Sequence, residues 1–427
     1  MNEKLFEFIK NSPTAFHAVD TLKKELKENG FKELFENEKW ELSFGGAYFV
    51  TRNFSSLIAF KLPKNGFHGY MIAAAHSDSP SFKIKENGEL SSEKYISLST
   101  EKYGGMLCST WLDRPLGVAG RVVLETENGV ETKLINSEQS VAVIPNVAIH
   151  MNRNANDNMS YNAAVDMLPL YSTGNNEGGF KAYLSKLCNV PYEKILGSDI
   201  YVYNTESGVE INDLICAPRL DDLQCVFSAK EAFLASQNEK SVPVLAVFDN
   251  EEVGSGTKQG AASTFLSDVL ERINSALKDG KEDFVSDVSD SFMLSCDNAH
   301  AVHPNHGEYA DRNHSVYMNG GIVIKYNANQ KYTTDALSAA IFKKIAKKAE
   351  VPTQSYCNRA DMPGGSTLGN ISNTVVSLNT ADIGLAQLAM HSSYETAGAY
   401  DTGYMIKVLT VFFASSVKND NNKLELS

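Results

Sequence analysis

The sequence lacks paired cysteines, and this absence excludes two kinds of stabilising site. Its 427 residues include six cysteines, none of them in a Cys-x-x-Cys pair. A zinc site built from thiolates needs such pairs, and a disulfide framework needs a secretory context that the amino-terminal residues do not supply. We therefore expect the six thiols to be reduced and mostly buried.

The chain also lacks a membrane segment. Its longest apolar runs are YMIAAA (70–75) and VPVLAVF (242–248), far below the roughly 20 residues that span a bilayer. The first residues, MNEKLFEFIKNSP, have neither the basic region nor the long apolar region of a secretory signal. The sequence therefore predicts a soluble, cytoplasmic protein without a membrane partner.

Positive charge is scarce as well. Asp and Glu number 52 against 39 Lys and Arg, which gives a formal net charge of −13. No basic cluster interleaved with aromatic residues is present, so nucleic acid is excluded as a partner. The acidic excess serves solubility, or it concentrates carboxylates in a site for a cation.

The composition is typical of a globular protein, and the sequence shows two structural patterns, one α/β and one β-rich. Hydrophobic residues make up 43% and charged residues 21%, enough for a full-sized core. Strands and helices alternate at 1–85 and 215–427, which predicts an α/β domain with a mostly parallel sheet covered on both faces. Residues 86–214 predict an inserted β-rich domain, with an Asn-, Gly- and Ser-rich surface loop at 152–180.

Histidine and carboxylate side chains follow three of the predicted strands. His76 comes directly after YMIAAA, Glu251 and Glu252 follow VPVLAVF, and Asp297 follows FMLSC. Ligands of an open parallel sheet bind outside the carboxyl ends of its strands. We therefore expect these groups to meet at one edge, although any one of them alone is more often a structural residue.

Crowded carboxylates need a compensating positive charge, and DNEEVGSG (249–256) contains no lysine or arginine. One or two divalent metal ions would supply it. Imidazole mixed with carboxylate, without thiolate, suits zinc first and manganese or cobalt as alternatives. A two-metal hydrolytic centre needs a bridging carboxylate and further ligands on each ion. The candidate ligands are His76, Asp221, Glu252, Asp297 and His391.

Two acids near these ligands have other predicted roles. Asp78 lies two residues after His76 and could hold the far nitrogen of its imidazole ring. Glu251 remains free to take a proton from a water that the metal activates. Each of these acids, taken singly, could equally be a solvated surface carboxylate.

Seven motifs carry a family resemblance that spans almost the whole chain. They are, in order, SPTAFHAV, HSDSP, YGGMLCSTWLDRPLGVAGRV, PRLDDL, FDNEEVGS, SCDNAHAVHPN and AMHSSYE. This set resembles the aspartyl aminopeptidase family, whose members are two-metal exopeptidases. The resemblance implies a three-layer α/β/α metallopeptidase domain at 1–85 and 215–427. It also implies that the insertion at 86–214 makes subunit contacts in a homo-oligomer, expected to be a dodecamer.

The resemblance further implies a role for each candidate. The implied metal ligands are His76 and Asp297 on one ion, Glu252 and His391 on the other, and Asp221 as the bridge. Glu251 would be the general base, and Asp78 would support the first histidine. The implied reaction removes the amino-terminal residue from peptides by a water that two metal ions activate. Asp or Glu is expected as that residue, with neutral residues as alternatives.

Four further residues match family positions near the substrate. His150, in IPNVAIHMNR, would contact substrate in its own subunit or in a neighbour's. A rival assignment makes it a zinc ligand together with His76 and His391. The residues that would line the substrate pocket are His300, Lys325 and Tyr332. The ammonium of Lys325 would meet an acidic first side chain, unless this lysine simply reaches solvent at its strand end.

Other enzyme classes fit the residues less well. GSGTKQG at 254–260 has the wrong spacing for a dinucleotide loop, and the serines of GGSTLG and VGSGT do not fit a Gly-x-Ser-x-Gly motif. Two alternatives to the peptidase remain open. One is a two-metal amidase or deacylase acting on small non-peptide amides, and the other is a non-catalytic assembly protein with a vestigial site.

Overall fold

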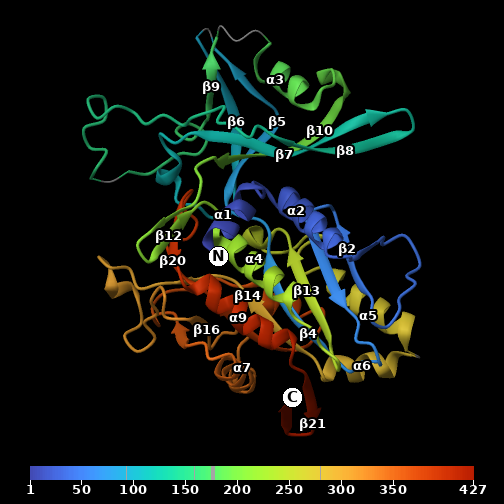
Figure 1. Ribbon diagram of the computed structural model, residues 1–427. Helices are drawn as coiled ribbons and strands as arrows, with labels where there is room; N and C mark the ends of the chain where they lie inside the picture. The colour runs from blue at the N-terminus through green and yellow to red at the C-terminus, as the bar shows by residue number, and fades with distance from the viewer. Residues whose placement is uncertain (93, 158, 175–177, 279) are drawn as a thin grey trace.

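A nine-stranded sheet forms the centre of the molecule in the computed structural model (Figure 1). The structure describes residues 1–92, 94–157, 159–174, 178–278 and 280–427. In sheet order the strands are β1 (Lys32–Leu34), β2 (Ala47–Arg52), β3 (Ser56–Lys61), β13 (Val242–Phe248), β4 (Tyr70–His76), β14 (Phe292–Cys296), β18 (Asn379–Gly384), β16 (Ile322–Tyr326) and β17 (Thr353–Cys357). The four central strands, from β13 to β18, run parallel to one another.

The central strands are buried on both faces, which explains their unbroken apolar sequences. In β4, Met71 and Ala73 pack on one side of the sheet, and Ile72 and Ala74 pack on the other. The helices on the first side are α1 (Asn2–Lys10), α2 (Ala15–Glu28), α4 (Leu220–Ala235), α7 (Ala336–Lys348) and α9 (Asp401–Phe413). Those on the second side are α5 (Phe265–Leu277), α6 (Lys281–Ser289) and α8 (Leu368–Ser372). The predicted three-layer α/β/α architecture is therefore confirmed.

A second sheet has six antiparallel strands and a hydrophobic core of its own. In sheet order its strands are β8 (Gly129–Asn136), β7 (Leu116–Thr126), β10 (Ile195–Asn204), β5 (Ser81–Ser91), β6 (Tyr95–Tyr103) and β9 (Leu170–Thr173). Five of these strands lie within 86–214, the region predicted to be β-rich, whereas β5 begins five residues before it. The domain limits at 86–214 stay a prediction.

The surface loop predicted at 152–180 is shorter than expected. β9 already begins at Leu170, and α3 (Gly179–Cys188) takes up the last two residues of the range. Aromatic packing explains the difference, because the rings of Tyr171 and Phe180 meet edge to face at 5.4 Å. The Asn- and Gly-rich composition of the region concealed these two anchoring side chains.

Smaller elements complete the fold. A five-stranded sheet joins distant parts of the chain, in the order β11 (Val209–Ile211), β12 (Leu214–Ala217), β20 (Glu395–Gly398), β19 (Ala386–Leu388) and β15 (Ala299–His300). The last hairpin is β21 (Val417–Asp420) and β22 (Lys423–Leu426). The 3-10 turns are η1 (Cys108–Trp111), η2 (Tyr192–Lys194), η3 (Glu251–Val253) and η4 (Gly307–Tyr309). Within the described ranges, no helix is long and apolar enough to cross a bilayer.

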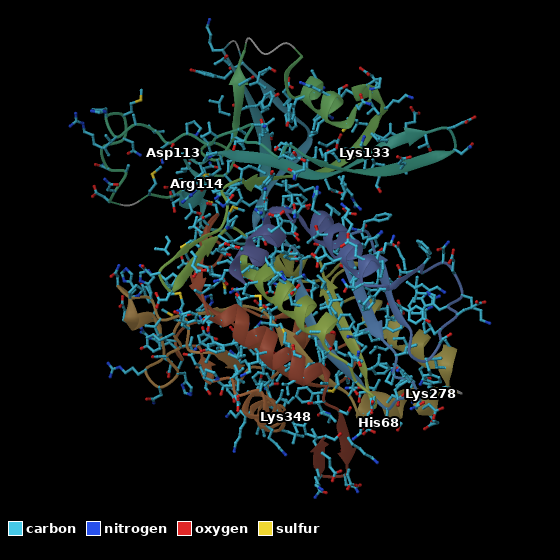
Figure 2. All side chains as sticks on the ribbon, in the orientation of Figure 1. His68, Asp113, Arg114, Lys133, Lys278 and Lys348 are labelled. Atoms are coloured by element: carbon cyan, nitrogen blue, oxygen red, sulfur yellow. The ribbon has the colours of Figure 1, made fainter. Side chains whose placement is uncertain are left out.

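The carboxyl ends of the central strands point toward the six-stranded sheet. His68, just before β4 begins, lies at the opposite end of the molecule, whereas Asp113 and Arg114 lie beside the six-stranded sheet (Figure 2). β4 ends at His76, and the chain enters the second sheet at Ser81. Side chains that follow the central strands therefore lie where the two sheets meet.

Candidate metal centre

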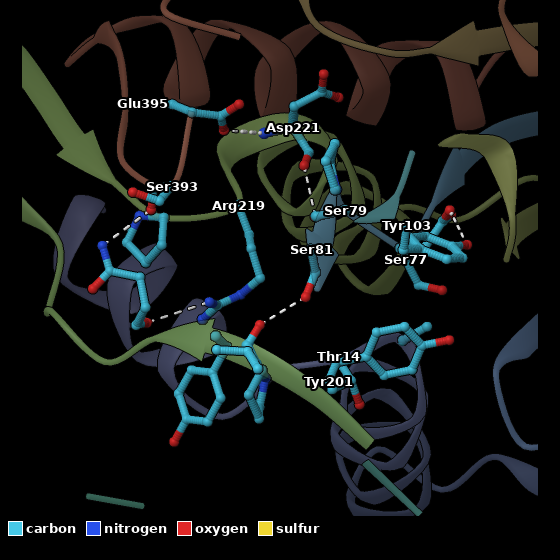
Figure 3. Close-up of a pocket in the computed structure, with 18 of the residues that line it drawn as sticks. Thr14, Ser77, Ser79, Ser81, Tyr103, Tyr201, Arg219, Asp221, Ser393 and Glu395 are labelled. Carbon is cyan, nitrogen blue, oxygen red and sulfur yellow. Dashed lines mark hydrogen bonds between the residues drawn. The ribbon is translucent and has the colours of Figure 1, made fainter. Parts of the chain in front are cut away.

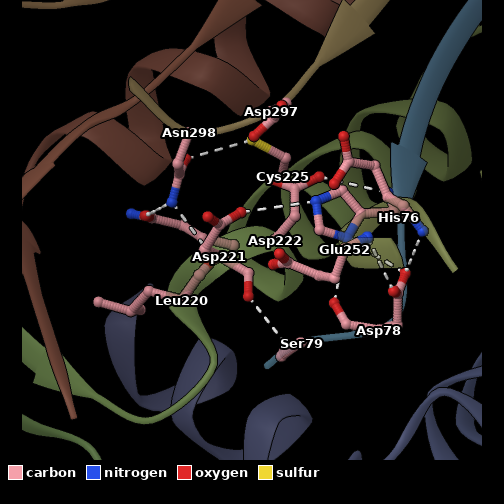
Figure 4. Close-up of polar contacts among 12 residues, drawn as sticks. His76, Asp78, Ser79, Leu220, Asp221, Asp222, Cys225, Glu252, Asp297 and Asn298 are labelled. Atoms are coloured by element: carbon pink, nitrogen blue, oxygen red, sulfur yellow. Dashed lines mark hydrogen bonds and ion pairs between the residues drawn. The ribbon is translucent and has the colours of Figure 1, made fainter. Parts of the chain in front are cut away.

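Three central strands carry His76, Glu252 and Asp297 to one place, beside Asp221 (Figure 4). β4 ends at His76, beside the end of β13. The turn η3, which follows β13, carries the two adjacent glutamates, and Asp297 follows β14. Asp221 comes from the first turn of α4, and His391 lies between β19 and β20. We call this region the metal edge.

Asp221 lies between the two histidines of the metal edge. Its Oδ1 is 3.5 Å from Nε2 of His76, and its Oδ2 is 3.5 Å from Nε2 of His391. The same nitrogen of His391 is 3.3 Å from Oε2 of Glu252. Asp221 is only 3% exposed and directs one oxygen to each imidazole. This arrangement suits a carboxylate that bridges two cations.

The side chains of the metal edge form two main ligand groups that share one carboxylate. The groups are His76, Asp221, Asp222 and Asp297 on one side and Asp221, Glu252 and His391 on the other, each with ligand atoms within 4.8 Å of one another. A further group at this edge contains His76, Glu251 and Glu252. The structure thus brings together all five ligands that the sequence predicted. Their individual roles stay predictions.

Unpaired oxygens show that a cation fits this edge. Oδ1 of Asp221, Oδ1 of Asp222 and Oε1 of Glu252 are buried, and no described residue donates a hydrogen bond to them. A carboxylate buried without a partner costs several kcal/mol, roughly, so it needs a counter-charge. Imidazole nitrogen and carboxylate oxygen are the donors that zinc accepts. The residues therefore fit one or more divalent metal ions.

Burial and crowding also change the protonation of these acids. Burial, reinforced by neighbouring carboxylates, raises the pKa of Glu251 to about 8. Burial and the charge of Asp221 raise the pKa of Glu252 well above its usual range. Burial opposes ionisation of Asp221 as well, but its two histidine neighbours hold its pKa below the usual range. The acid between the imidazoles therefore ionises most readily, as a bridging ligand must.

Asp78 contacts the far ring nitrogen of His76 and also makes backbone contacts that the sequence did not predict. Nδ1 of His76 is 3.0 Å from the main-chain carbonyl of Asp78 and 3.4 Å from its carboxylate Oδ1. The carboxylate accepts hydrogen bonds from the backbone N–H groups of Glu251 and Glu252, at 3.1 and 3.2 Å. Asp78 therefore orients the imidazole and the turn that carries both glutamates.

Two acids without a predicted role accept hydrogen bonds from the backbone N–H groups of the candidate ligands. Glu395 is 1% exposed and accepts hydrogen bonds from the backbone N–H of Asp221 at 2.9 Å and of His391 at 2.7 Å (Figure 3). Asp222 accepts a hydrogen bond from the backbone N–H of His76 at 3.3 Å. Both acids lie inside motifs, PRLDDL and AMHSSYE, but a carboxylate that serves backbone groups has no sequence signature of its own.

A cavity of about 130 Å³ lies over the metal edge. Its further lining includes the predicted His300, Lys325 and Tyr332, and two residues that were not predicted, Tyr356 and Thr367. Lys325 is 2% exposed, so it does not reach solvent. Its Nζ donates to the carbonyl of Asn298 at 3.1 Å and lies 3.5 Å from Oδ2 of Asp297. Burial lowers the pKa of this ammonium, but its neighbours, Asp297 first among them, together outweigh burial and raise it overall.

His150 lies apart from the metal edge. It is exposed, in the long loop between β8 and β9 that extends from the six-stranded sheet (Figure 1). Among the described residues, neither the ligand groups nor the lining of the cavity includes it. The structure of one chain therefore gives no support to a zinc site made of His76, His150 and His391.

The sequence matches a known family along nearly its whole length. A family model described as aminopeptidase I zinc metalloprotease (M18) matches residues 8–413. The chain is 46% identical over 422 residues to a protein of Clostridium novyi (strain NT) named probable M18 family aminopeptidase 2. That alignment covers 96% of this chain and 98% of the relative.

Solved structures share the fold. A structure described as the Ape4 and Nbr1 complex superposes with a TM-score of 0.92 and 35% sequence identity, covering 96% of this chain and 84% of that one. A structure described as the S. cerevisiae mApe1 dodecamer superposes with a TM-score of 0.84 and 27% identity, covering 96% and 95%. These comparisons extend across both large sheets.

Proposed function

The chain belongs to the M18 family of zinc aminopeptidases, and we propose that it removes the amino-terminal residue of peptides at a centre for two metal ions. Asp221 carries this proposal, because its two carboxylate oxygens face two different imidazoles. A carboxylate so placed can serve two ions at once, as two-metal hydrolases require.

The residues of the metal edge divide into ligands and a base. The proposed ligands are His76 and Asp297 for one ion, Glu252 and His391 for the other, and Asp221 for both. When bound, the ions supply Lewis-acid chemistry that polarises a carbonyl and acidifies a water. Glu251 lines the same cavity and is left free to accept the proton of the attacking water and pass it to the leaving amine. Asp78 fixes Glu251 by accepting a hydrogen bond from its backbone N–H.

The acidic lining explains why the reaction would begin at an amino terminus. A free terminal ammonium is a cation, and the carboxylates of Glu252 and Asp297 face the cavity that would receive it. An internal peptide bond carries no such charge and gains no attraction from this acidic lining. The cavity therefore favours an exopeptidase over an endopeptidase.

We propose Asp or Glu as the preferred first residue, with Lys325 as the selecting group. Its ammonium lies in the cavity wall, 5.4 Å from the ring centre of Tyr332, and His300 lies at the exposed rim. Asp297 already balances part of the charge of Lys325. Neutral first residues are therefore the alternative outcome, and a substrate panel separates the two.

The test uses metal-stripped protein reconstituted separately with zinc, manganese and cobalt. Each form is assayed on peptides that differ only in an amino-terminal Asp, Glu, Leu or Lys. We expect activity to return with metal and to favour Asp or Glu, and Lys325→Met to abolish that preference while activity on Leu persists. Activity that favours Leu would keep the aminopeptidase and remove Lys325 as the selector. Bound ions without peptidase activity would contradict the function and favour the amidase or the non-catalytic protein.

We also propose that the chain forms a homo-oligomer, with a dodecamer as the expected size. The loop that carries His150 exposes several apolar side chains, among them Val147, Met151 and Val165, and contiguous exposed apolar groups are typical of subunit contacts. In such an assembly His150 would contact substrate bound to a neighbouring subunit. Light scattering on the purified protein checks the size, and a monomer at micromolar concentration would contradict it. A cytoplasmic location stays a prediction.

A further inference from the structure

Tyr103 belongs to the six-stranded sheet but contacts the support of His76. It is the last residue of β6, and its hydroxyl donates a hydrogen bond to Oδ2 of Asp78 at 2.7 Å. The ring lines a small cavity between the two sheets, with Tyr201 beside it (Figure 3). The two rings meet edge to face with centroids 5.5 Å apart. The six-stranded sheet therefore holds the ring of Tyr103, while its hydroxyl contacts Asp78, which follows β4 of the nine-stranded sheet.

The direction of this hydrogen bond is set by Asn250. The amide oxygen of Asn250 accepts from the hydroxyl of Thr257 at 2.8 Å and from Nε2 of Gln259 at 2.7 Å. Its amide nitrogen must therefore face the other way, where it donates to the hydroxyl oxygen of Tyr103 at 2.8 Å. Because that oxygen accepts a hydrogen bond from Asn250, the O–H of Tyr103 points to Asp78.

The hydrogen bond from Tyr103 reaches a carboxylate that orients three functional groups. Asp78 accepts from the backbone N–H of Glu251 and of Glu252, and its carboxylate lies 3.4 Å from Nδ1 of His76. Each carboxylate oxygen of Asp78 accepts from one of these two backbone groups. The donation from Tyr103 gives Oδ2 a second donor and restrains the plane of the carboxylate further.

The chain that follows Tyr103 also packs against the metal edge. A Cβ atom on Gly104 would lie 3.1 Å from Cβ of Glu252, so the backbone just after β6 approaches this proposed ligand closely. Further along, the backbone N–H of Leu107 donates to the carbonyl of His391 at 3.1 Å. These contacts leave Tyr103 little freedom to move away from Asp78.

We propose that Tyr103 is a positioning residue of the metal centre, which makes the six-stranded sheet a working part of the site. It acts through Asp78, on the orientation of His76 and of the turn with Glu251 and Glu252. This inference rests on the proposed function insofar as it assumes that the metal edge binds zinc. It adds a residue from the second sheet to the hydrogen-bond network behind the ligands.

The test compares Tyr103→Phe with Tyr201→Phe in the full chain. Each variant removes one hydroxyl from neighbouring rings in the same cavity, and only the first removes the donor to Asp78. We expect Tyr103→Phe to weaken zinc binding about 10- to 100-fold, measured by competition with a chelator. At saturating zinc its kcat should fall while KM for peptide stays near the wild-type value. The visible absorption bands of the cobalt form should shift in Tyr103→Phe and not in Tyr201→Phe.

A second variant guards against a folding defect. Asn250→Gly tolerates the left-handed backbone at this position, where φ is 62°, and removes the amide that orients the hydroxyl. Its zinc affinity should lie between those of the wild type and Tyr103→Phe. Wild-type zinc affinity and cobalt spectrum in Tyr103→Phe would overturn the proposal. A wild-type protein that binds zinc without cleaving peptides would contradict the proposed function alone, and one that binds no zinc would overturn both.

Discussion

The metal edge and the long loop of the six-stranded sheet hold histidines and acids in opposite environments. At the metal edge, His76 is 1% exposed and Asp221 is 3% exposed, and strands on either side fix the backbone. In the loop between β8 and β9, His150 and Asp157 are exposed and turns replace strands. Beside them Met151 is 84% exposed.

The contrast shows that a buried charged group needs a partner within the site, whereas an exposed one does not. A carboxylate in the loop is satisfied by water, so its position demands nothing further. At the metal edge, one buried oxygen each of Asp221, Asp222 and Glu252 has no donor among the described residues. The unmet charge, rather than the residue type, makes this edge a candidate cation site. In the proposed oligomer, a second subunit would cover the loop.

Asp221→Asn should have the largest effect on metal content and activity, because it removes the buried charge that distinguishes the metal edge from the loop. The amide keeps the shape of the side chain but removes the negative charge that faces both imidazoles. We expect metal content to fall toward zero and peptidase activity to fall to background, because both ions lose a ligand. Metal analysis after dialysis and a peptide assay give the two readouts.

Asp157→Asn is the matched change in the loop. The same chemical substitution at an exposed position should leave metal content and activity at the wild-type values. Full metal occupancy in Asp221→Asn would refute the bridging role. Metal loss in Asp157→Asn would show that the two regions are not as different as their burial indicates.

Glu251→Gln should separate chemistry from metal binding within the metal edge. The variant loses the proton acceptor while the five proposed ligands remain. We expect kcat to fall about 100- to 10,000-fold, the usual contribution of a general base, with metal content unchanged. Near-normal turnover in this variant would remove Glu251 as the base. Metal loss would instead make it a ligand.

Glu395→Gln should have a smaller effect, because this acid touches the ligands only through their backbones. The carboxylate accepts from the backbone N–H groups of Asp221 and His391 and, at 3.4 Å, from Nε2 of Gln387, whereas an amide offers one acceptor and one donor, so a donor would face a donor. We expect metal affinity or activity to fall about 10- to 100-fold. Glu206→Gln, at a surface ion pair, is the control and should change neither. Equal behaviour of the two variants would reduce Glu395 to a structural acid.

Three of the proposed ligands could be located from the sequence because they follow buried strands. Unbroken apolar runs such as β4 and β13 mark strands covered on both faces, and their carboxyl ends must meet at one edge. His76, Glu252 and Asp297 were placed by that rule alone. Asp221 and His391 needed the motifs as well, since neither follows one of these apolar strands.

Residues that act through backbone groups could not be predicted. Glu395 and Asp222 accept from backbone N–H groups, and Tyr103 reaches its partner from another sheet. Such contacts depend on how loops approach each other, which no periodicity in the sequence records. The loop predicted at 152–180 failed for a related reason, because Tyr171 and Phe180 pair through space within a polar stretch.

The smallest expected effect lies in α2, where the nine-stranded and six-stranded sheets approach each other. Phe16 packs under the guanidinium of Arg121 from β7, and the next residue, His17, shares a hydrogen bond with Thr14 at 2.9 Å. Burial lowers the pKa of His17 to about 4, below its usual value of 6.5. Between these values the unfolded chain binds a proton that the folded chain does not. The free energy of unfolding should therefore be complete above pH 6.5 and decrease as the pH falls toward 4.

His17→Gln removes this titration and keeps a polar side chain. Between pH 7 and pH 5 the variant should lose about 1 kcal/mol less unfolding free energy than the wild type, after allowance for the partial exposure of the ring. Denaturant unfolding of both metal-stripped proteins at the two pH values measures the difference. Metal removal matters, because protonation of the ligands would otherwise add its own pH dependence. Equal losses in the two proteins would show that His17 titrates as it does in water, and that the seam between the sheets is open to solvent there.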